Sequence, residues 1–326
     1  MAWVGKKHPK IGSICSDFRG SHKSSRRKVN VIVSYQLGLI SLGTLALGQI
    51  VSSIEVPDEQ VVYKKVGEVN LHLDIFKPKG HQADDTCPCI VFFFGGGWTG
   101  GTPSQFYPHA QYLASRGMVA ISVEYRVSSR HGTLPYQCVE DGKSSIRWIR
   151  QHASTLGVDP DRIAAGGGSA GAQVAAATAT TITFDEPSED LEVSAKPNAL
   201  VLFNPVFDNG PDGFGYERVK DRWQEFSPLH NITAGICPTI VFLGAEDTLI
   251  PVSTAQEYKN QMAKVGGQCY LWIYEGQPHG FFNYQDGNNP YYNATVFECD
   301  KFLVSLGYLA GAPTIQNKQV KATLSQ

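Results

Sequence analysis

Six short runs of apolar residues, separated by stretches with helical periodicity, leave few architectures open to this chain. The runs cover residues 90–94, 119–123, 162–167, 199–203, 239–243 and 270–274. Runs that are apolar throughout are typical of parallel strands buried on both faces. Residues 61–66 and 69–76 predict two more strands, and the alternating polarity of 69–76 is typical of a strand with one wet face. We therefore predict an α/β protein with a mostly parallel eight-stranded sheet flanked by helices on both faces.

The pentapeptide Gly167-Gly168-Ser169-Ala170-Gly171 lies between one of these runs and a stretch of small residues that should begin a helix near Ala170. A serine on such a sharp strand-to-helix turn holds its hydroxyl out at the top of the sheet, and only small residues fit beside it. The pattern alone is equally compatible with an ordinary Gly/Ser loop, because a glycine-rich chain can contain it by chance. Three other segments favour the catalytic interpretation.

The first of these segments is Gly95-Gly96-Gly97-Trp98, which follows the apolar run at 90–94. Successive glycines after a strand leave backbone N–H groups uncovered, so these groups can point at a developing oxyanion. A flexible linker is the alternative. The strand before the glycines and the tryptophan after them favour a fixed loop.

The other two segments supply an acid and a base. The run at 239–243 leads into a loop with Glu246 and Asp247, and the run at 270–274 leads into a loop with His279. A serine, a carboxylate and a histidine are the groups that nucleophilic acyl transfer uses. One other histidine, His230, follows the serine along the chain. No strand precedes it, so we interpret it as structural or associated with a lid.

Together these segments resemble the α/β-hydrolase superfamily over residues 60–308. They are similar to its esterase and lipase branch with HGGGW and GxSAG motifs, which includes hormone-sensitive-lipase-like esterases and feruloyl- and acetyl-xylan-esterase-like carboxylesterases. One departure is Phe94, which stands where that branch usually has a histidine that orders the loop. Further matches are Glu124-Tyr125-Arg126, Pro135, Asp141, Arg147-Trp148 and Asp159-Pro160-Asp161-Arg162-Ile163.

The resemblance implies an α/β-hydrolase fold and a triad in the usual chain order, with Ser169 as nucleophile, Asp247 as acid and His279 as base. Asp247 is preferred to its neighbour Glu246 because the spacing Gly-x-x-Asp-x-x-x-Pro places it where the family has its acid. A triad of this kind transfers an acyl group to water through an acyl-enzyme.

The resemblance also implies that the N–H groups of Gly96 and Gly97 form the oxyanion hole, which Ala170 joins as the residue after the nucleophile. The expected substrates are short acyl esters or carbohydrate-linked acetyl and feruloyl esters. An arylformamidase-type amide hydrolase and a non-catalytic binding protein with a hydrolase fold are the alternatives. No cofactor is expected.

Two insertions interrupt the alternation of strands and helices. Residues 181–197 contain five acids and predict a solvated loop. Residues 207–236 are rich in aromatic side chains, so this segment is either a long loop with ordinary packing or a small lid over the site. On the lid interpretation we expect Trp98, Phe207 and Tyr216 to contact the substrate.

Charge is distributed unevenly along the chain. Residues 1–53 contain eight of the 28 Lys and Arg residues and one of the 30 acids, so residues 54–326 have a formal net charge of −9. An acidic body argues against a nucleic-acid partner. The basic start is followed by an uncharged run, residues 31–54, which is typical of a signal peptide. We expect export to the periplasm or the exterior with no stable membrane insertion after cleavage; a membrane anchor and an unstructured tail are the alternatives.

The expected domains are a signal peptide at 1–53, a catalytic domain at 54–310 and a C-terminal tail at 311–326. Six cysteines fall in the body, an even number that is compatible with disulfides but fixes no pairing. We recognise no C-x-x-C motif and no His/Cys cluster in the sequence, so we predict no catalytic metal.

Overall fold

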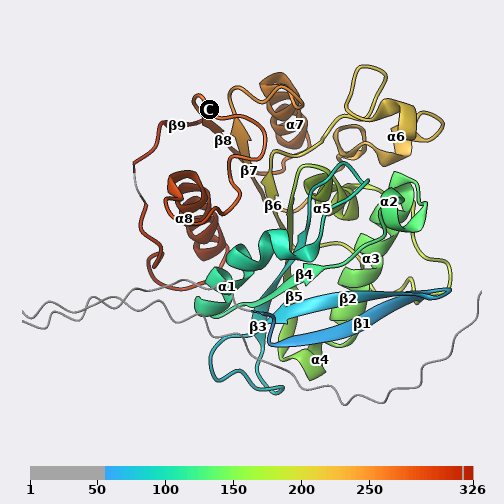
Figure 1. Cartoon of the computed structure of the whole chain (residues 1–326), viewed down its shortest axis with the longest axis vertical. Helices are drawn as coiled ribbons and strands as arrows, with labels where there is room; N and C mark the ends of the chain where they lie inside the picture. Colours follow the sequence, from blue (N-terminus) through green and yellow to red (C-terminus); the bar gives the residue numbers. More distant parts are fainter. Residues whose placement is uncertain (1–55, 318, 326) are drawn as a thin grey trace, which may run out of the picture. The chain divides into compact units, whose positions relative to one another are not determined.

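The computed structural model describes residues 56–317 and 319–325, and within them nine strands form one sheet (Figure 1). The strand order is β1-β2-β4-β3-β5-β6-β7-β8-β9. Strands β3 to β8 run parallel to one another, whereas β1 and β2 at one edge and β9 at the other pair antiparallel. The strands are β1 (Glu59–Val66), β2 (Val69–Phe76), β3 (Cys87–Phe93), β4 (Val119–Val123), β5 (Val158–Gly168), β6 (Ala199–Phe203), β7 (Thr239–Gly244), β8 (Cys269–Tyr274) and β9 (Ala322–Leu324).

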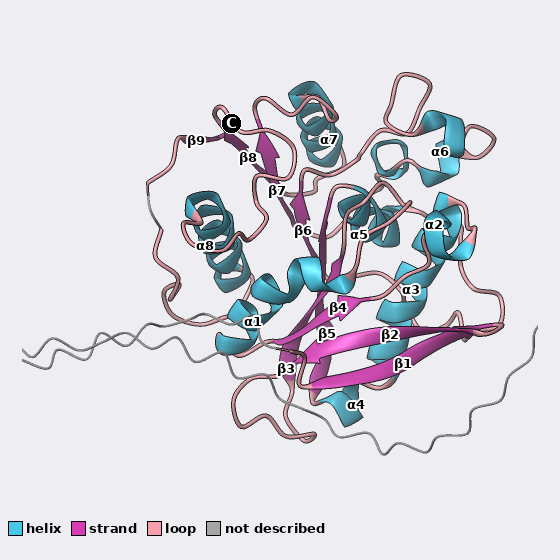
Figure 2. Cartoon of the chain, in the orientation of Figure 1, coloured by secondary structure: helices cyan, strands magenta, loops and turns pink. Residues whose placement is uncertain are grey.

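Helices cover both faces of this sheet (Figure 2). Helices α1 and α8 share one apolar core with the sheet, and α3, α5 and α7 share the other. This is the layered arrangement of an α/β protein, and it confirms the predicted fold class. The helices are α1 (Tyr107–Ser115), α2 (Ser128–His131), α3 (Pro135–Gln151), α4 (Ala153–Leu156), α5 (Ala170–Thr180), α6 (Trp223–Phe226), α7 (Val252–Lys264) and α8 (Pro290–Ser305), with 3₁₀ turns η1 (Pro103–Phe106), η2 (Tyr216–Arg218) and η3 (Pro228–Asn231).

The predicted number of strands was one too few. The ninth strand, β9, lies in the segment expected to be a C-terminal tail, and it pairs with β8 through Trp272 opposite Leu324. Three residues give too short a pattern for periodicity to reveal. The end of the described chain therefore forms an edge of the sheet.

Helix α5 is buried along its whole length because it is built from small residues. It packs directly on the sheet and on α3, where a Cβ added to Gly142 would lie 2.6 Å from the Val174 Cγ1 atom. Such close packing fixes the position of the first turn of α5. That turn begins immediately after Ser169.

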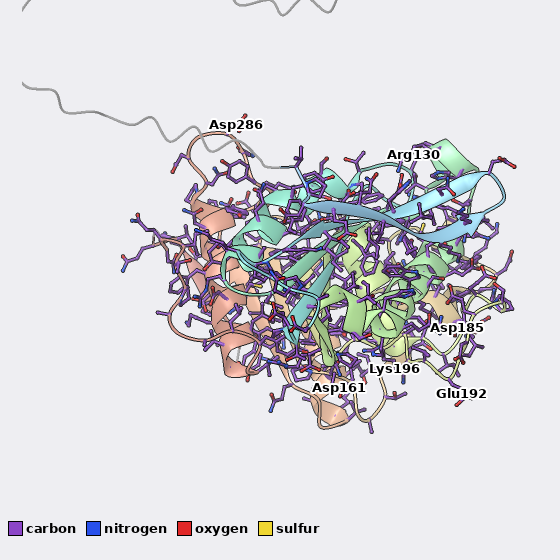
Figure 3. The ribbon with its side chains drawn as sticks, turned by 90° about the horizontal axis from the view of Figure 1, so that it is seen from below. Arg130, Asp161, Asp185, Glu192, Lys196 and Asp286 are labelled. Carbon is purple, nitrogen blue, oxygen red and sulfur yellow. The ribbon has the colours of Figure 1, made fainter. Side chains whose placement is uncertain are left out.

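The acidic loop at 181–197 is less solvated than its composition suggested. Asp185 accepts from the ammonium of Lys143 at 2.6 Å and from the guanidinium of Arg147 at 2.7 Å, and Arg147 also pairs with Glu189. Both bases belong to α3 and are almost fully buried, so they need these carboxylates as partners. Figure 3 shows Asp185 and Glu192 of this loop at the outside of the molecule. The expectation of a solvated loop was therefore wrong for the paired Asp185 and Glu189, whereas Glu192 is exposed.

The predicted signal peptide at 1–53 lies outside the described residues. Among the described residues, no helix combines the length and the apolar character that crossing a membrane requires. The six body cysteines are all free, and Cys89, Cys138 and Cys299 are buried.

Candidate active site

Ser169 lies on a strained turn between β5 and α5. Its φ is 55° and its ψ is −120°, values that an L-residue adopts only when the surrounding structure enforces them. A Cβ at Gly167 would lie 2.5 Å from the Phe93 carbonyl oxygen, and one at Gly171 would overlap the carbonyl oxygens of Phe93 and Phe94. The flanking glycines are therefore required by close approach of the β3 backbone, as the pentapeptide predicted.

The three predicted triad residues lie within hydrogen-bonding distance of one another. His279 Nε2 is 2.9 Å from Ser169 Oγ, and His279 Nδ1 is 2.7 Å from Asp247 Oδ2. Asp247 follows β7 and His279 follows β8, so loops after parallel strands bring the three side chains to one edge of the sheet. The carboxylate of Asp247 is fully buried, whereas the imidazole of His279 is 21% exposed and can meet a substrate.

Four donors surround the carboxylate of Asp247. Its Oδ1 atom accepts from the backbone N–H groups of Leu249 at 2.9 Å and Ile250 at 3.0 Å. Its Oδ2 atom accepts from Asn204 Nδ2 at 2.7 Å as well as from His279. Burial alone would raise the pKa of Asp247, but the hydrogen bonds, that of His279 foremost, outweigh it and lower the pKa. Asp247 is thus ionised at neutral pH, whereas the rival Glu246 is exposed to solvent.

The glycine loop after β3 lies directly against Ser169. A Cβ at Gly95 would lie 3.4 Å from the Ser169 Cβ, and both Gly96 and Gly97 have positive φ values, of 126° and 60°. Gly96, Gly97 and Ser169 line one cavity. Ala170 is the first residue of α5, so its N–H has no acceptor within the helix.

Side chains on either side of the loop hold it in place. The ring of Phe94 stacks on Tyr125 with centroids 4.1 Å apart, so an aromatic pair occupies the position where the resemblance led us to look for a histidine. Trp98 is buried and donates from Nε1 to Gln173 Oε1 of α5 at 3.1 Å. The guanidinium of Arg218 donates to the carbonyl oxygen of Gly97.

An amide pair connects the glycine loop to the histidine loop. The N–H of Gly95 donates to Gln105 Oε1 at 2.6 Å, and Gln105 Nε2 donates to Asn283 Oδ1 at 2.9 Å. Asn283 Nδ2 then donates to the carbonyl oxygen of Gly280, the residue after His279, at 2.8 Å. Because each amide both accepts and donates, the chain of hydrogen bonds has a single direction from one loop to the other.

A cavity of about 570 Å³ opens beside Ser169. Its walls combine the glycine loop with a few apolar side chains and the amide pair. Its lining residues are Gly95, Gly96, Gly97, Gly101, Thr102, Ser104, Gln105, Ser169, Phe214, Leu249, His279, Gly280, Phe282 and Asn283.

In the described part of the chain, the side chains that line this cavity are not the ones predicted to contact the substrate. Phe207 is fully buried and stacks on Tyr258 with centroids 3.7 Å apart, so it belongs to the core. Trp98 faces α5 and lines a separate cavity of about 520 Å³, and Tyr216 is in neither lining. None of these three lines the cavity beside Ser169, so their contact with the substrate stays a prediction. From the 207–236 insertion, Phe214 lines the cavity instead.

Sequence analysis missed four residues that surround the site: Gln105, Asn204, Arg218 and Asn283. Asn204 directly follows β6, and a polar residue after a buried strand could have been recognised by the same argument that selected Asp247. The other three lie in segments without regular periodicity, and Gln105 and Asn283 are 178 positions apart. His230 lies against Trp223 and Ser227, which agrees with a structural role.

Two family models match the chain. One, described as BD-FAE, covers residues 73–209, and one described as the dienelactone hydrolase family covers residues 223–302. The chain is 29% identical over 243 residues to the probable carboxylic ester hydrolase LipM of Mycobacterium tuberculosis, an alignment that covers 66% of this chain and 54% of LipM. It is 25% identical over 222 residues to an acetylxylan esterase of Xylanibacter ruminicola, covering 60% of this chain and 42% of that esterase. The chain spans about half the length of these curated relatives.

One match to a solved structure extends over almost the whole of the solved protein. The apo form of Thermogutta terrifontis esterase 2 is 46% identical, and the match has a TM-score of 0.75 and covers 78% of this chain and 96% of the esterase. The same esterase has been solved with propionate bound, with butyrate bound and phosphorylated by paraoxon.

Proposed function

The chain belongs to the α/β-hydrolase superfamily, in its esterase and lipase branch, and we propose that it hydrolyses carboxylic esters through an acyl-enzyme on Ser169. The observation that carries the proposal is the chain of hydrogen bonds from Asp247 through His279 to Ser169, with heavy-atom distances of 2.7 and 2.9 Å. In this geometry a base whose charge-stabilising partner is already in place can take the proton of the nucleophile.

The direction of proton transfer follows from the ionised state of Asp247. A carboxylate can only accept, so His279 Nδ1 carries the ring proton and Nε2 accepts the hydroxyl hydrogen of Ser169. Ser169 Oγ attacks the ester carbonyl as Nε2 takes its proton, and the imidazolium then protonates the leaving alcohol. Water, deprotonated by the same nitrogen, releases the acid and restores the serine.

The negative charge of the tetrahedral intermediate requires donors on the opposite side of Ser169. We assign this role to the N–H groups of Gly96, Gly97 and Ala170, which the positions of the glycine loop and of the first turn of α5 support. The positive φ values of the two glycines support a loop shape that residues with side chains would adopt only with strain.

Short acyl groups are the substrates that we propose. Thermogutta terrifontis esterase 2 has been solved with propionate and with butyrate, and an acetylxylan esterase is among the relatives, which supports small acyl groups. Glycines without side chains line one part of the cavity beside Ser169, and the apolar side chains of Phe214, Leu249 and Phe282 line another. Carbohydrate-linked acetyl and feruloyl esters are the other substrates that we propose.

A substrate panel tests the proposal. Kinetics on p-nitrophenyl acetate, butyrate and decanoate, on acetylated xylan, on methyl ferulate and on formanilide should give the highest kcat/KM for acetate or butyrate. Faster turnover of formanilide than of any ester would replace the ester hydrolase with an arylformamidase-type amide hydrolase. Absence of turnover with all six compounds by the folded protein would favour a binding protein.

We also propose that residues 1–53 are an export signal, on the basis of their eight-to-one excess of basic over acidic residues and the uncharged run that follows. N-terminal sequencing of protein recovered from an exporting host tests this. Cleavage between about Gln49 and Ile54 is the expected result, whereas an intact N-terminus in the membrane fraction would indicate an anchor.

A further inference from the structure

Three side chains with metal-binding atoms meet at the amino end of β3. His81 and Asp85 lie on the loop between β2 and β3, and Cys87 is the first residue of β3 (Figure 1). His81 Nδ1 is 3.2 Å from Asp85 Oδ2 and 3.7 Å from Cys87 Sγ, and all three ligand atoms lie within 4.8 Å of one another. Residues 81 to 87 thus bring an imidazole, a carboxylate and a thiol to one point, although no C-x-x-C motif marks it.

Contacts outside the cluster hold its donor atoms in place. The imidazole of His81 is only 4% exposed, and its Nε2 atom lies 2.8 Å from the carbonyl oxygen of Leu156. A carbonyl can only accept, so Nε2 carries a proton and Nδ1 is directed at the cluster. A histidine that donates its second nitrogen to a carbonyl is the usual arrangement of a metal ligand, because this bond fixes both ring orientation and tautomer.

The backbone around the ring is equally constrained. The N–H of Gln82 donates to Asp85 Oδ2 at 2.8 Å, and the N–H of Cys87 donates to the carbonyl oxygen of Gly157 at 2.9 Å. A Cβ at Gly157 would lie 2.6 Å from the Cε1 atom of His81, so the turn before β5 packs against the imidazole. The three ligands are therefore preorganised by two neighbouring segments.

The distances from His81 Nδ1 to the two other ligand atoms are close to those in a zinc site. With Zn–N and Zn–O bonds of about 2.0–2.2 Å and a Zn–S bond of about 2.3 Å, tetrahedral coordination separates ligand atoms by roughly 3.3–3.6 Å. The distances from His81 Nδ1, 3.2 Å to Asp85 Oδ2 and 3.7 Å to Cys87 Sγ, lie just below and just above this range. Imidazole together with thiolate selects zinc over magnesium and calcium, which prefer oxygen ligands only.

The geometry points to a zinc site formed by His81, Asp85 and Cys87, with solvent at the fourth position; we propose that it is structural. The cluster lies at the start of β3, whereas the glycine loop follows the end of the same strand, about 20 Å away at roughly 3.3 Å per residue. A metal there joins the β2–β3 loop to the sheet and takes no part in ester hydrolysis. Burial raises the pKa of the Cys87 thiol, and zinc displaces this proton on binding.

Metal titration of the full chain tests the site. Protein freed of metal by a chelator and kept reduced with a phosphine should bind one equivalent of Zn²⁺, and Co²⁺ in its place should give a thiolate-to-metal charge-transfer absorption. Cys87→Ser and His81→Ala should each weaken Zn²⁺ binding at least about tenfold. Cys87→Ser should also abolish the charge-transfer band.

Two control variants match these substitutions. His72 pairs with Glu124 at 2.8 Å and Cys237 is a free, half-buried thiol, and neither belongs to the cluster, so His72→Ala and Cys237→Ser should retain stoichiometric zinc binding. Esterase activity of all four variants, unchanged from that of the parent chain, shows that they are folded. Failure of the parent chain to bind Zn²⁺, or undiminished binding by Cys87→Ser and His81→Ala, would overturn the proposal and leave a proton-mediated His81–Asp85 pair.

Discussion

The two ends of the parallel strands differ in how their backbone is shaped. At the carboxyl ends, Trp98, Ser169 and Asn204 follow β3, β5 and β6, and all three have positive φ values although none is glycine. In the described residues only one other non-glycine residue, Phe184, shares this conformation. Strain that the surrounding structure enforces is typical of functional sites.

At the amino ends of the strands the chain turns without such strain. The turns before β4 and β5 have positive φ at Gly117 and Gly157. Because glycine has no Cβ, it adopts this conformation without strain. The ion pairs that Lys143 and Arg147 of α3 make with the acidic loop involve none of these strained residues. The difference suggests that substitutions at the carboxyl edge reduce catalysis more than folding stability, whereas substitutions elsewhere do the reverse.

The largest effect is expected for Ser169→Ala, which removes the nucleophile. Activity on a short-chain ester should fall by about 10⁶ in kcat, while the melting temperature stays close to that of the parent chain. Steady-state kinetics and thermal unfolding on the same preparation measure both quantities. Retention of more than about 1% of the activity, with contaminating esterase excluded, would refute the role of Ser169.

Asp247→Asn should lower kcat by about 10⁴, because an amide at this position can stabilise the wrong tautomer of His279. Glu246→Gln is the matched control, since Glu246 is adjacent but exposed. It should leave kcat within about twofold of the parent value if Glu246 makes no contribution. The reverse ranking of the two variants would identify Glu246 as the acid.

Asn204→Ala removes one of the donors to Asp247 Oδ2, a bond of 2.7 Å. A hydrogen bond to a charged group contributes about 1.5–3 kcal/mol, so kcat should fall roughly 10- to 100-fold with little change in KM. Asn209→Ala, which removes a buried amide that donates to the Phe214 carbonyl, is the control and should affect stability more than kcat. Equal loss of kcat in both variants would contradict a specific role for Asn204.

The amide pair sharpens the comparison because it joins two catalytic loops. Gln105→Ala and Asn283→Ala should each reduce kcat by about 3- to 10-fold, which corresponds to loss of a neutral hydrogen bond. If the pair acts as a unit, the double variant should be little worse than either single one, since the Gln105–Asn283 bond is lost in all three variants. Multiplicative effects of the two substitutions would show that the amides act independently.

The smallest effect on catalysis is expected for Asp185→Asn, far from the strained edge. Burial alone would raise the pKa of Asp185, but hydrogen bonds from Lys143 and Arg147 outweigh it and lower the pKa. A carboxyl with a lowered pKa stabilises the fold above its unfolded pKa of about 3.9 and loses this contribution as pH falls through the lower folded value. The parent chain should therefore lose stability below about pH 4 more steeply than Asp185→Asn in urea unfolding, with kcat at neutral pH unchanged. Parallel pH profiles would contradict the pairing.

The sequence predicted features that depend on neighbouring residues along the chain. The apolar runs predicted the parallel strands, and the glycines around Ser169 predicted a turn whose tightness the structure explains by the carbonyl oxygens of β3. Asp247 and His279 could be selected because each follows a strand, and all strands of a parallel sheet present their carboxyl ends at one edge.

The rest depends on contacts between distant segments. Whether Phe207 faces the cavity or the core depends on Tyr258, which stacks on it from α7. The basic partners of the acidic loop lie on α3. Strand β9 is too short to show a periodic pattern of apolar residues. His81, Asp85 and Cys87 fall within seven residues, but their convergence depends on the carbonyl of Leu156 in α4.

The most direct test of the account is covalent labelling with paraoxon, followed by intact-mass and peptide mass spectrometry. A serine activated by His279 and Asp247 should take one diethylphosphoryl group per chain, located on Ser169. His279→Ala and Asp247→Asn should slow the reaction by orders of magnitude, whereas Glu246→Gln should not. Phosphorylation at another residue, or equal rates in the His279→Ala variant and the parent chain, would contradict a triad built on Ser169.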